Sequence, residues 1–272
     1  MCVQELHSRT NPGIEMTAVA VIPARFASTR FPAKALAKDT GRYLIQHVYE
    51  QTRAARCIGR VIVATDDQRI VDAVRSFGGE AVMTRSDHES GTDRVAEVAQ
   101  GLDCAVVVNV QGDEPEIEPA ALDRLVSLFD QPDCQIATLA CPFAAVPGGD
   151  PADPNAVKVV RDHRGRALYF SRACIPFARD GRYAPEAGPL LHLGTYAYRR
   201  EFLLRLAALP PTALERTERL EQLRVLEHGY DIFVALVERA AVGIDTPEDY
   251  AAFVKRYGAG PSTISPQVKA EP

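Results

Sequence analysis

A short segment near the start of the 272-residue chain gathers cationic and hydroxyl side chains. It reads PARFASTRFPAK from Pro23 to Lys34, and its functional side chains are Arg25, Ser28, Thr29, Arg30 and Lys34. Arginine neutralises phosphate oxygens through a planar fork and lysine as a mobile point charge, while backbone amides of a loop can complete the cradle. The segment therefore fits a polyphosphate, although a solvated basic loop shaped by its prolines fits the composition equally well.

Two turns that carry acidic residues are further candidates. Residues 109–115 (NVQGDEP) end an apolar run and contain Asp113. Mg²⁺ binds one or two carboxylates together with substrate phosphates and water, so Asp113 is a candidate ligand, and capping of the turn is the competing role. In the second turn, residues 243–249, Asp245 or Thr246 could cap the start of a helix.

Other kinds of chemistry find no support in the sequence. It has neither a G-x-G-x-x-G nor a Walker A motif, no HExxH among its 6 histidines, and no CxxC among its 6 cysteines. The net charge of -5 gives no bulk affinity for nucleic acid. No run approaches the roughly 20 apolar residues of a membrane span, and no signal peptide is apparent, so we expect reduced thiols and a cytoplasmic protein without membrane insertion.

The elements that must position these residues alternate in the first half of the chain. Continuous apolar runs predict strands at 18–22, 60–64, 80–83 and 104–110. Apolar residues at helical spacing predict helices near 44–55, 70–77 and 95–102, the last opened by the capping-box pair Ser90 and Asp93. The pattern indicates a doubly wound α/β fold with a mostly parallel sheet, in which ligands bind beyond the carboxyl ends of the strands.

The second half mixes strands and helices less regularly. Helices are predicted near 122–129, 202–209, 218–229 and 247–257, and strands at 135–140, 157–160, 167–170 and 231–236. The strands 157–160 and 167–170 should pair across a turn. With no repeat and no linker, we expect one domain over 16–257 with a smaller β-rich insertion, between a disordered leader (1–15) and a flexible tail (258–272).

Many motifs, in order from about residue 18 to about 257, carry a resemblance to one enzyme family. They are VIPAR (21–25) with Ser28, Thr29, Arg30 and Lys34, then ATD (64–66), SGTDR (90–94), NVQGDEP (109–115), PNAVK (154–158), YFSR (169–172), HLGTY (192–196), LEQLR (220–224) and GIDTPED (243–249). The chain resembles the 3-deoxy-manno-octulosonate cytidylyltransferases, the CMP-Kdo synthetases of lipopolysaccharide synthesis. The resemblance implies a Rossmann-like nucleotidyltransferase fold, a homodimer, and a β-rich insertion that forms the sugar site and the dimer interface.

The resemblance also implies a reaction and its residues. A hydroxyl of Kdo would attack the α-phosphorus of CTP, and pyrophosphate would leave. Arg25, Ser28, Thr29, Arg30 and Lys34 would hold the triphosphate with Gln111, while Asp113 and Asp245 would bind Mg²⁺ and act with Lys34 in catalysis. Such a transfer depends on positioning and on neutralising charge.

The acidic sugar needs cationic and neutral donors together with acceptors. The residues at matching positions are Arg94, Gln111, His192, Tyr196, Glu221 and Gln222, with Lys158 and Arg172 as electrostatic supports. Taken alone, His192 and Tyr196 could simply pack in strands, and Glu221 could be a solvated helix residue. Another acidic sugar, such as a sialic acid or an amino-Kdo analogue, and a catalytically silent nucleotide-binding protein of the same fold remain as alternatives.

One position departs from the family pattern. Where the family has Pro-Gly-Lys in the nucleotide loop, this chain has Pro32-Ala33-Lys34. Alanine tolerates positive φ poorly, so we expect Ala33 in a right-handed or extended conformation, or a shifted loop.

Overall fold

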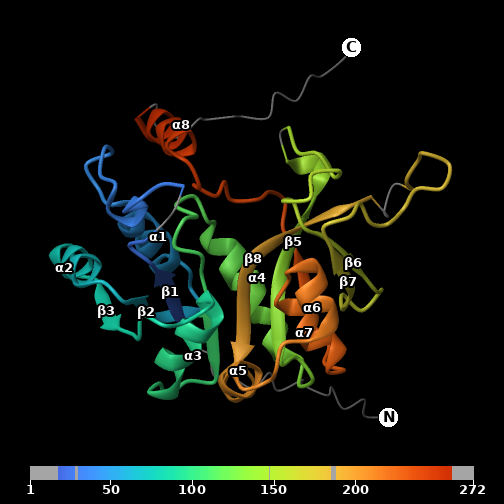
Figure 1. The fold of residues 1–272 in the computed structure, drawn as a ribbon, viewed down its shortest axis with the longest axis horizontal. Coiled ribbons are helices and arrows are strands. Elements are labelled where there is room, and N and C mark those ends of the chain that lie inside the picture. The colour runs from blue at the N-terminus through green and yellow to red at the C-terminus, as the bar shows by residue number, and fades with distance from the viewer. Residues whose placement is uncertain (1–17, 28–29, 147, 185–187, 259–272) are drawn as a thin grey trace, which may run out of the picture.

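The computed structural model describes residues 18–258 except 28–29, 147 and 185–187, and a nine-stranded sheet forms its centre (Figure 1). The main path of the sheet runs β3-β2-β1-β4-β8-β5-β9, and the β6–β7 pair joins it through β8. The strands are β1 (Ala18–Ala24), β2 (Ile58–Thr65), β3 (Glu80–Met83), β4 (Val106–Asn109), β5 (Ile136–Pro142), β6 (Lys158–Arg161), β7 (Ala167–Ser171), β8 (Leu190–Arg199) and β9 (Phe233–Leu236).

Strand β8 divides the sheet into two parallel parts. β1 pairs in parallel with β2 and β4, β2 with β3, and β5 with β9. β8 runs antiparallel to both β4 and β5. The mostly parallel sheet and the antiparallel β6–β7 pair are thus confirmed. The sequence pattern does not predict β8, because His192, Gly194 and Thr195 interrupt its apolar run.

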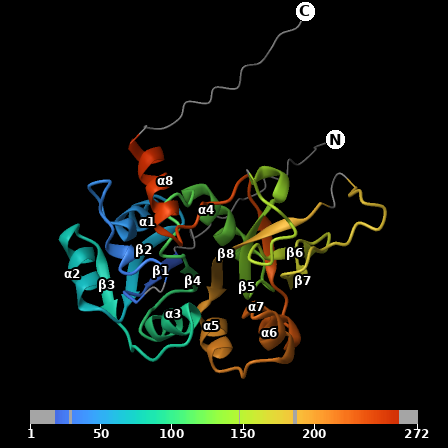
Figure 2. The same cartoon turned by 45° about the horizontal axis from the view of Figure 1, so that its top comes forward.

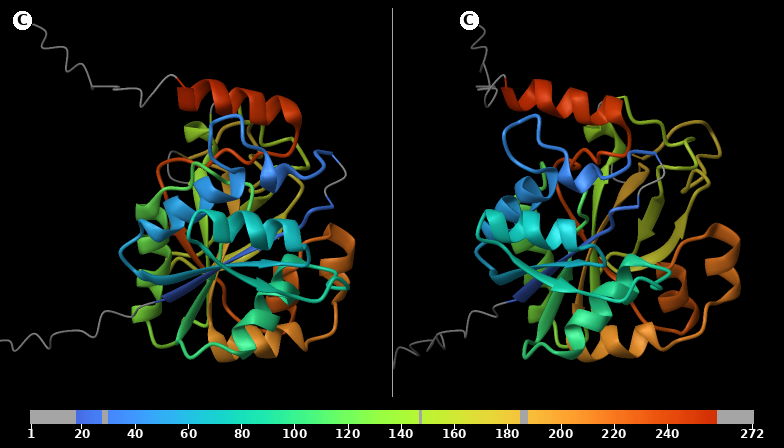
Figure 3. Two further views of the ribbon diagram at one scale, coloured as in Figure 1. Left: turned by 90° about the vertical axis from the view of Figure 1, so that its left-hand side faces the viewer. Right: turned by 60° about the vertical axis from the view of Figure 1, so that its left-hand side comes forward.

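Helices cover both faces of this sheet, as Figure 3 shows. They are α1 (Leu44–Arg53), α2 (Gln68–Ser76), α3 (Gly91–Gln100), α4 (Pro119–Ser127), α5 (Arg200–Ala207), α6 (Ala213–Glu218), α7 (Gln222–Glu227) and α8 (Pro247–Gly258). Along β1, Ala20 and Ile22 pack with α1, α2 and α4, whereas Val19 and Val21 pack with α3, α5 and α7. This double burial explains why the strand is apolar throughout. Within the described part of the chain, no helix combines the length and the apolar character needed to cross a membrane.

The helix predicted at 218–229 is confirmed only over α7, and the sequence pattern does not predict the short helix α6 that precedes it. The two helices are separated at Arg219. Arg219 ends α6 in the left-handed conformation, with φ 53 and ψ 51, and its backbone N–H donates to the carbonyl of Glu215. A continuous helix cannot pass through this conformation, so α7 leaves in a new direction.

The last helix, α8, lies across the end of the sheet beside the loop that follows β1 (Figure 2). Tyr250 and Phe253 of α8 form a small apolar cluster with Leu44 and Ile244, against which Phe31 packs. The Tyr250 hydroxyl also accepts a hydrogen bond of 2.8 Å from the backbone N–H of Asp39. The C-terminal helix therefore fixes the loop that carries the N-terminal cations.

The expectation for Ala33 is wrong, because this residue adopts the left-handed conformation with φ 57 and ψ 22. Its backbone is held on both sides. The N–H of Ala33 donates to the carbonyl of Phe26 at 3.1 Å, and its carbonyl accepts from Leu36 at 2.8 Å. The left-handed conformation costs an L-residue about 1–2 kcal/mol. The loop therefore has the backbone conformation that suits glycine, although the residue is alanine.

We predict that Ala33→Gly stabilises the protein. Relief of the strain outweighs the greater entropy of glycine in the unfolded chain, which costs about 0.4–1 kcal/mol, and leaves a net gain of about 0.5–1 kcal/mol. The free energy of unfolding in urea measures it. Ala35→Gly is the matched control: Ala35 is buried in the 3-10 helix Lys34–Leu36, so its substitution should destabilise. An Ala33→Gly variant no more stable than the wild type contradicts the argument.

Candidate active site

Lys34 brings three distant parts of the chain together. Its ammonium group donates to Asp113 Oδ2 at 2.7 Å, to the carbonyl of Ile244 at 2.8 Å and to Asp245 Oδ1 at 3.4 Å. Arg30 reaches the same Asp245 oxygen at 3.1 Å. The two carboxylates predicted as metal ligands thus converge on one point beyond the carboxyl ends of β1 and β4.

Backbone geometry holds the two acidic residues at this point. The N–H of Ile244 donates to the carbonyl of Asp113 at 2.9 Å, which joins the two turns directly. Gly112 lets the turn after β4 approach β1, because a Cβ there would lie 2.8 Å from the carbonyl oxygen of Pro23. At the start of α8, Thr246 and Asp249 cap each other reciprocally. Asp245 is therefore not needed as the helix cap, and its side chain faces the cations.

The remaining residues of the basic segment are only partly described. Arg25 is exposed and donates to the carbonyl of His88 at 2.8 Å, which ties the segment to the loop before α3. Ser28 and Thr29 lie outside the described residues. Of the predicted triphosphate ligands, the structure thus brings Arg30 and Lys34 to the two carboxylates, with Arg25 further along the loop.

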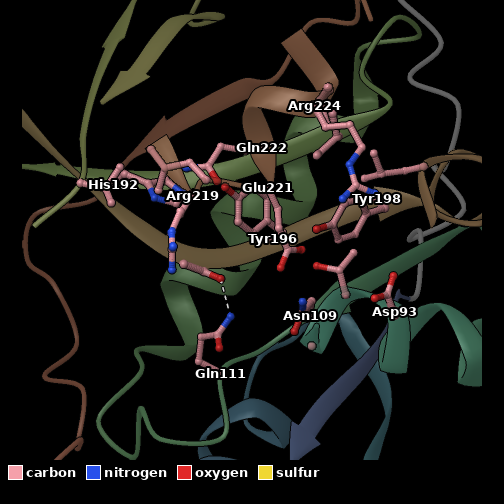
Figure 4. A pocket seen from close by; sticks show the side chains of 18 of the residues that line it. Asp93, Asn109, Gln111, His192, Tyr196, Tyr198, Arg219, Glu221, Gln222 and Arg224 are labelled. Atoms are coloured by element: carbon pink, nitrogen blue, oxygen red, sulfur yellow. Dashed lines mark hydrogen bonds between the residues drawn. The ribbon is translucent and has the colours of Figure 1, made fainter. Parts of the chain in front are cut away.

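A cavity of about 500 Å³ opens between β4, β8 and the α6–α7 turn, and Gln111, two residues before Asp113, lines it (Figure 4). Five of the predicted sugar-binding residues line it: Gln111, His192, Tyr196, Glu221 and Gln222. Gln111 is held by a hydrogen bond of 2.7 Å from its side-chain amide to the carbonyl of Gly194. The side chains of His192, Tyr196 and Tyr198 point to one face because strand residues alternate, and a register irregularity against β5 accommodates the extra residues between them.

The polar groups of this cavity differ in exposure: Asn109 is buried, His192 and Tyr196 are half-buried, and Glu221 is exposed. Desolvation lowers the pKa of His192 to about 3, so its imidazole is neutral, and it pairs with the Thr138 hydroxyl at 3.1 Å. Desolvation also raises the pKa values of Glu221 and Tyr196. The Asn109 Oδ1 atom and the Tyr196 hydroxyl are buried with no partner at hydrogen-bonding distance and angle among the described residues. Such orphan groups favour a ligand rich in hydroxyls.

Arg94 is not brought into the cavity, which corrects its predicted contact with the sugar. Its side chain is fully buried and donates to Asp66 at 2.9 Å and to Thr84 at 2.5 Å. This arginine ties α3 to the ends of β2 and β3. It can act on a ligand only through the elements that it positions.

The two supporting cations also have structural partners. The fully buried Lys158 donates to the carbonyls of Asp153 and Arg172, at 2.8 and 2.6 Å. The Arg172 guanidinium donates to the carbonyls of Glu218, Pro154 and Arg219. Arg172 therefore holds the β6–β7 insertion against the α6–α7 region, and Lys158 joins two segments within the insertion.

Several cavity residues have no counterpart in the sequence predictions. They are chiefly Asn109, Tyr198, Arg219 and Arg224. Strand alternation could have found the first two, since Asn109 precedes Gln111 by two residues and Tyr198 follows Tyr196 by two. Nothing in the pattern separates Arg219 from other exposed arginines, because its placement depends on the break between α6 and α7.

Comparisons with known proteins define the class. Residues 19–232 match the cytidylyltransferase family. A solved structure of CMP:2-keto-3-deoxy-manno-octonic acid synthetase complexed with CTP superposes with a TM-score of 0.83 at 42% identity, and covers 89% of this chain and 99% of that one. The fold and the sequence together are thus those of a cytidylyltransferase.

Similar sequences narrow the class further. The 3-deoxy-manno-octulosonate cytidylyltransferase of Syntrophotalea carbinolica is 52% identical over 241 residues, which cover 86% of this chain and 96% of the relative. That of Geobacter sulfurreducens is 51% identical over 243 residues, with the same coverage of 86% and 96%. The chain belongs to the 3-deoxy-manno-octulosonate cytidylyltransferase family.

The lowered pKa of His192 predicts a pH-dependent stability. Below the unfolded value of 6.5 the unfolded chain binds a proton that the folded protein, with its pKa of about 3, does not. The contribution of His192 to the free energy of unfolding is therefore fully present above pH 6.5. It decreases as the pH is lowered, by about 2 kcal/mol near pH 5. In His192→Gln, the loss of unfolding free energy between about pH 7.5 and about pH 5 should be smaller by that amount.

The matched control is His163→Gln, at an exposed position in the turn between β6 and β7. Its loss of stability on acidification should equal that of the wild type. An equal loss in His192→Gln would show that this imidazole takes up a proton in the folded protein.

Proposed function

We propose that this chain transfers CMP from CTP to the anomeric hydroxyl of Kdo, and so releases pyrophosphate and forms CMP-Kdo for lipopolysaccharide synthesis. The observation that carries the proposal is the pair of adjoining sites. Lys34 and the carboxylates of Asp113 and Asp245 converge after β4, and the cavity lined by His192, Tyr196 and Glu221 also contains Gln111, two residues before Asp113. The identity of about 50% to enzymes named for this reaction supports the assignment.

The reaction forms one bond and breaks one. The anomeric oxygen of Kdo bonds to the α-phosphorus of CTP while the bond to the β-phosphate oxygen breaks, and the hydroxyl proton is released. Negative charge moves onto the departing pyrophosphate, so the catalyst must supply cations around it. Arg25, Arg30 and Lys34, with the hydroxyls of Ser28 and Thr29, are the groups we assign to the triphosphate.

Mg²⁺ fits the two converging carboxylates. Asp113 and Asp245 approach the same ammonium group, and among the described residues no group of three or more His, Cys, Asp or Glu side chains could hold a metal by itself. Two protein carboxylates completed by phosphates and water is the set that Mg²⁺ prefers. When bound, the ion would act as a Lewis acid and a template, and would lower the pKa of the attacking hydroxyl.

The sugar occupies the cavity in this proposal. Gln111 lies two residues before Asp113, so a sugar held by Gln111 would have its anomeric hydroxyl close to the triphosphate. The neutral imidazole of His192, the orphan Tyr196 hydroxyl and the Glu221 carboxylate offer donors and acceptors to the sugar hydroxyls. Gln222 adds an amide from the first turn of α7.

We predict that the purified protein releases pyrophosphate from CTP when Mg²⁺ and Kdo are both present. Removal of the metal with EDTA should abolish the release, and added Mg²⁺ should restore it. A coupled pyrophosphate assay over a panel of acidic sugars measures this. Release with a sialic acid or an amino-Kdo analogue but not with Kdo would reassign the substrate, and no release with any sugar would favour a silent nucleotide-binding protein.

The variant Asp113→Asn tests whether the activity depends on this site. Loss of one charged metal ligand should lower turnover at least about a hundredfold while the melting temperature stays close to that of the wild type. Asp133→Asn, at an exposed position before β5, is the matched control and should keep full turnover. Near-normal turnover in Asp113→Asn would make Asp113 a turn residue only.

We also propose a homodimer in the cytoplasm. The described cysteines are all free, which fits a reducing compartment, and the exposed Phe177, 85% accessible, stands beside the β6–β7 insertion expected to form the dimer interface. Sedimentation equilibrium should give twice the chain mass of 29.7 kDa, and Phe177→Ser should shift the protein toward single copies. A single-copy mass for the wild type at all concentrations would contradict the dimer.

A further inference from the structure

The substrate carboxylate needs a cation in the sugar cavity, and the structure offers few. Among the residues described, the cationic side chains that line the cavity are Arg219 and Arg224. His192 is neutral, and Lys158 and Arg172 donate to backbone carbonyls. The cavity also contains the carboxylates of Asp93 and Glu221, which repel an incoming anion.

The guanidinium of Arg224 already has partners within the protein. Its guanidinium forms a two-pronged ion pair with Glu215, at 2.8 and 2.5 Å, and donates to the carbonyl of Leu209 at 3.1 Å. This pair holds α6 and α7 together. A carboxylate on Arg224 would have to displace Glu215, which is largely buried beside it.

Arg219 differs from Arg224 in this respect. Its guanidinium makes no hydrogen bond or ion pair with the described residues, and its side chain lines the cavity. In Figure 4 it extends from the α6–α7 turn toward the side of the cavity where Gln111 lies. Gln111 follows β4 and precedes Asp113 by two residues, so this is the side nearer the two converging carboxylates.

The backbone of Arg219 carries a strain that serves this orientation. Its left-handed conformation costs about 1–2 kcal/mol, which a glycine would avoid. The bend separates α6 from α7 and lets Leu220, Glu221 and Gln222 reach the cavity. Strained residues of this kind cluster where function fixes the geometry.

We propose that Arg219 recognises the carboxylate of the acidic sugar. This inference rests on the proposed function. In a 2-keto acid the carboxylate is attached to the anomeric carbon, so a guanidinium that grips it with two parallel hydrogen bonds also orients the attacking hydroxyl. The positive charge beside that hydroxyl favours loss of its proton. Arg219 thus determines specificity for acidic sugars and positions the nucleophile.

The test compares kinetic constants for both substrates. Arg219→Gln should raise the KM for Kdo about tenfold to a hundredfold, because a charge-assisted pair is lost, while the KM for CTP changes less than about twofold. Arg219→Gly also removes the cation, but it relieves the backbone strain. A rise in the KM for Kdo that both variants show is therefore due to loss of the guanidinium. Arg205→Gln, at an exposed position on α5, is the matched control for charge and should match the wild type.

A neutral substrate completes the test. For the wild type, the C1 carboxamide of Kdo should have a lower kcat/KM than Kdo itself. For Arg219→Gln, the difference in kcat/KM between the two substrates should be much smaller. Equal discrimination by both proteins, or an unchanged KM for Kdo in Arg219→Gln and Arg219→Gly, would overturn the role of Arg219. The proposed function fails in a different way, namely if the wild type itself releases no pyrophosphate with Kdo.

Discussion

The ammonium group of Lys34 is the contact on which the rest of the site depends. It joins a loop after the first strand, a turn after β4 and a turn before the last helix, and two of its partners are 210 and 211 residues away in sequence. Three negatively polarised oxygens converge on it, and without a cation between them Asp113 and Asp245 would repel each other. Because these contacts involve separate elements, the basic loop cannot move without disturbing α8.

This dependence explains the strained backbone at Ala33. The residue next to Lys34 adopts a left-handed conformation, and two backbone hydrogen bonds hold it there: its N–H donates to the carbonyl of Phe26, and its carbonyl accepts from the N–H of Leu36. The three partners of Lys34 add further constraint on the same turn. A local strain of about 1–2 kcal/mol survives when the surroundings determine the conformation this strongly.

Short-range patterns predict most of this fold and part of the site. The apolar strand β1, the capping box of α3 and the β6–β7 pair all follow from neighbouring residues, and the sequence places them well. β8 escapes prediction because its residues face a ligand cavity as well as the core, so its apolar pattern is broken. The roles of Arg94 and Arg219 depend on tertiary placement: one arginine is enclosed by Asp66 and Thr84, and the other is turned into a cavity by a helix break.

The distribution of cations decides how two anionic substrates could share one site. Arg30 and Lys34 lie at the carboxylates beyond β1 and β4, and Arg219 lines the cavity, so each anion would meet its own positive charge. Part of the cavity is removed from water, and this burial keeps the imidazole of His192 neutral. In such surroundings Coulomb interactions are stronger than in water, and an unmatched carboxylate would be expelled. A net charge of -5 for the whole chain is therefore compatible with binding two anions, because the selection is made by a few cations at fixed positions rather than by the overall field.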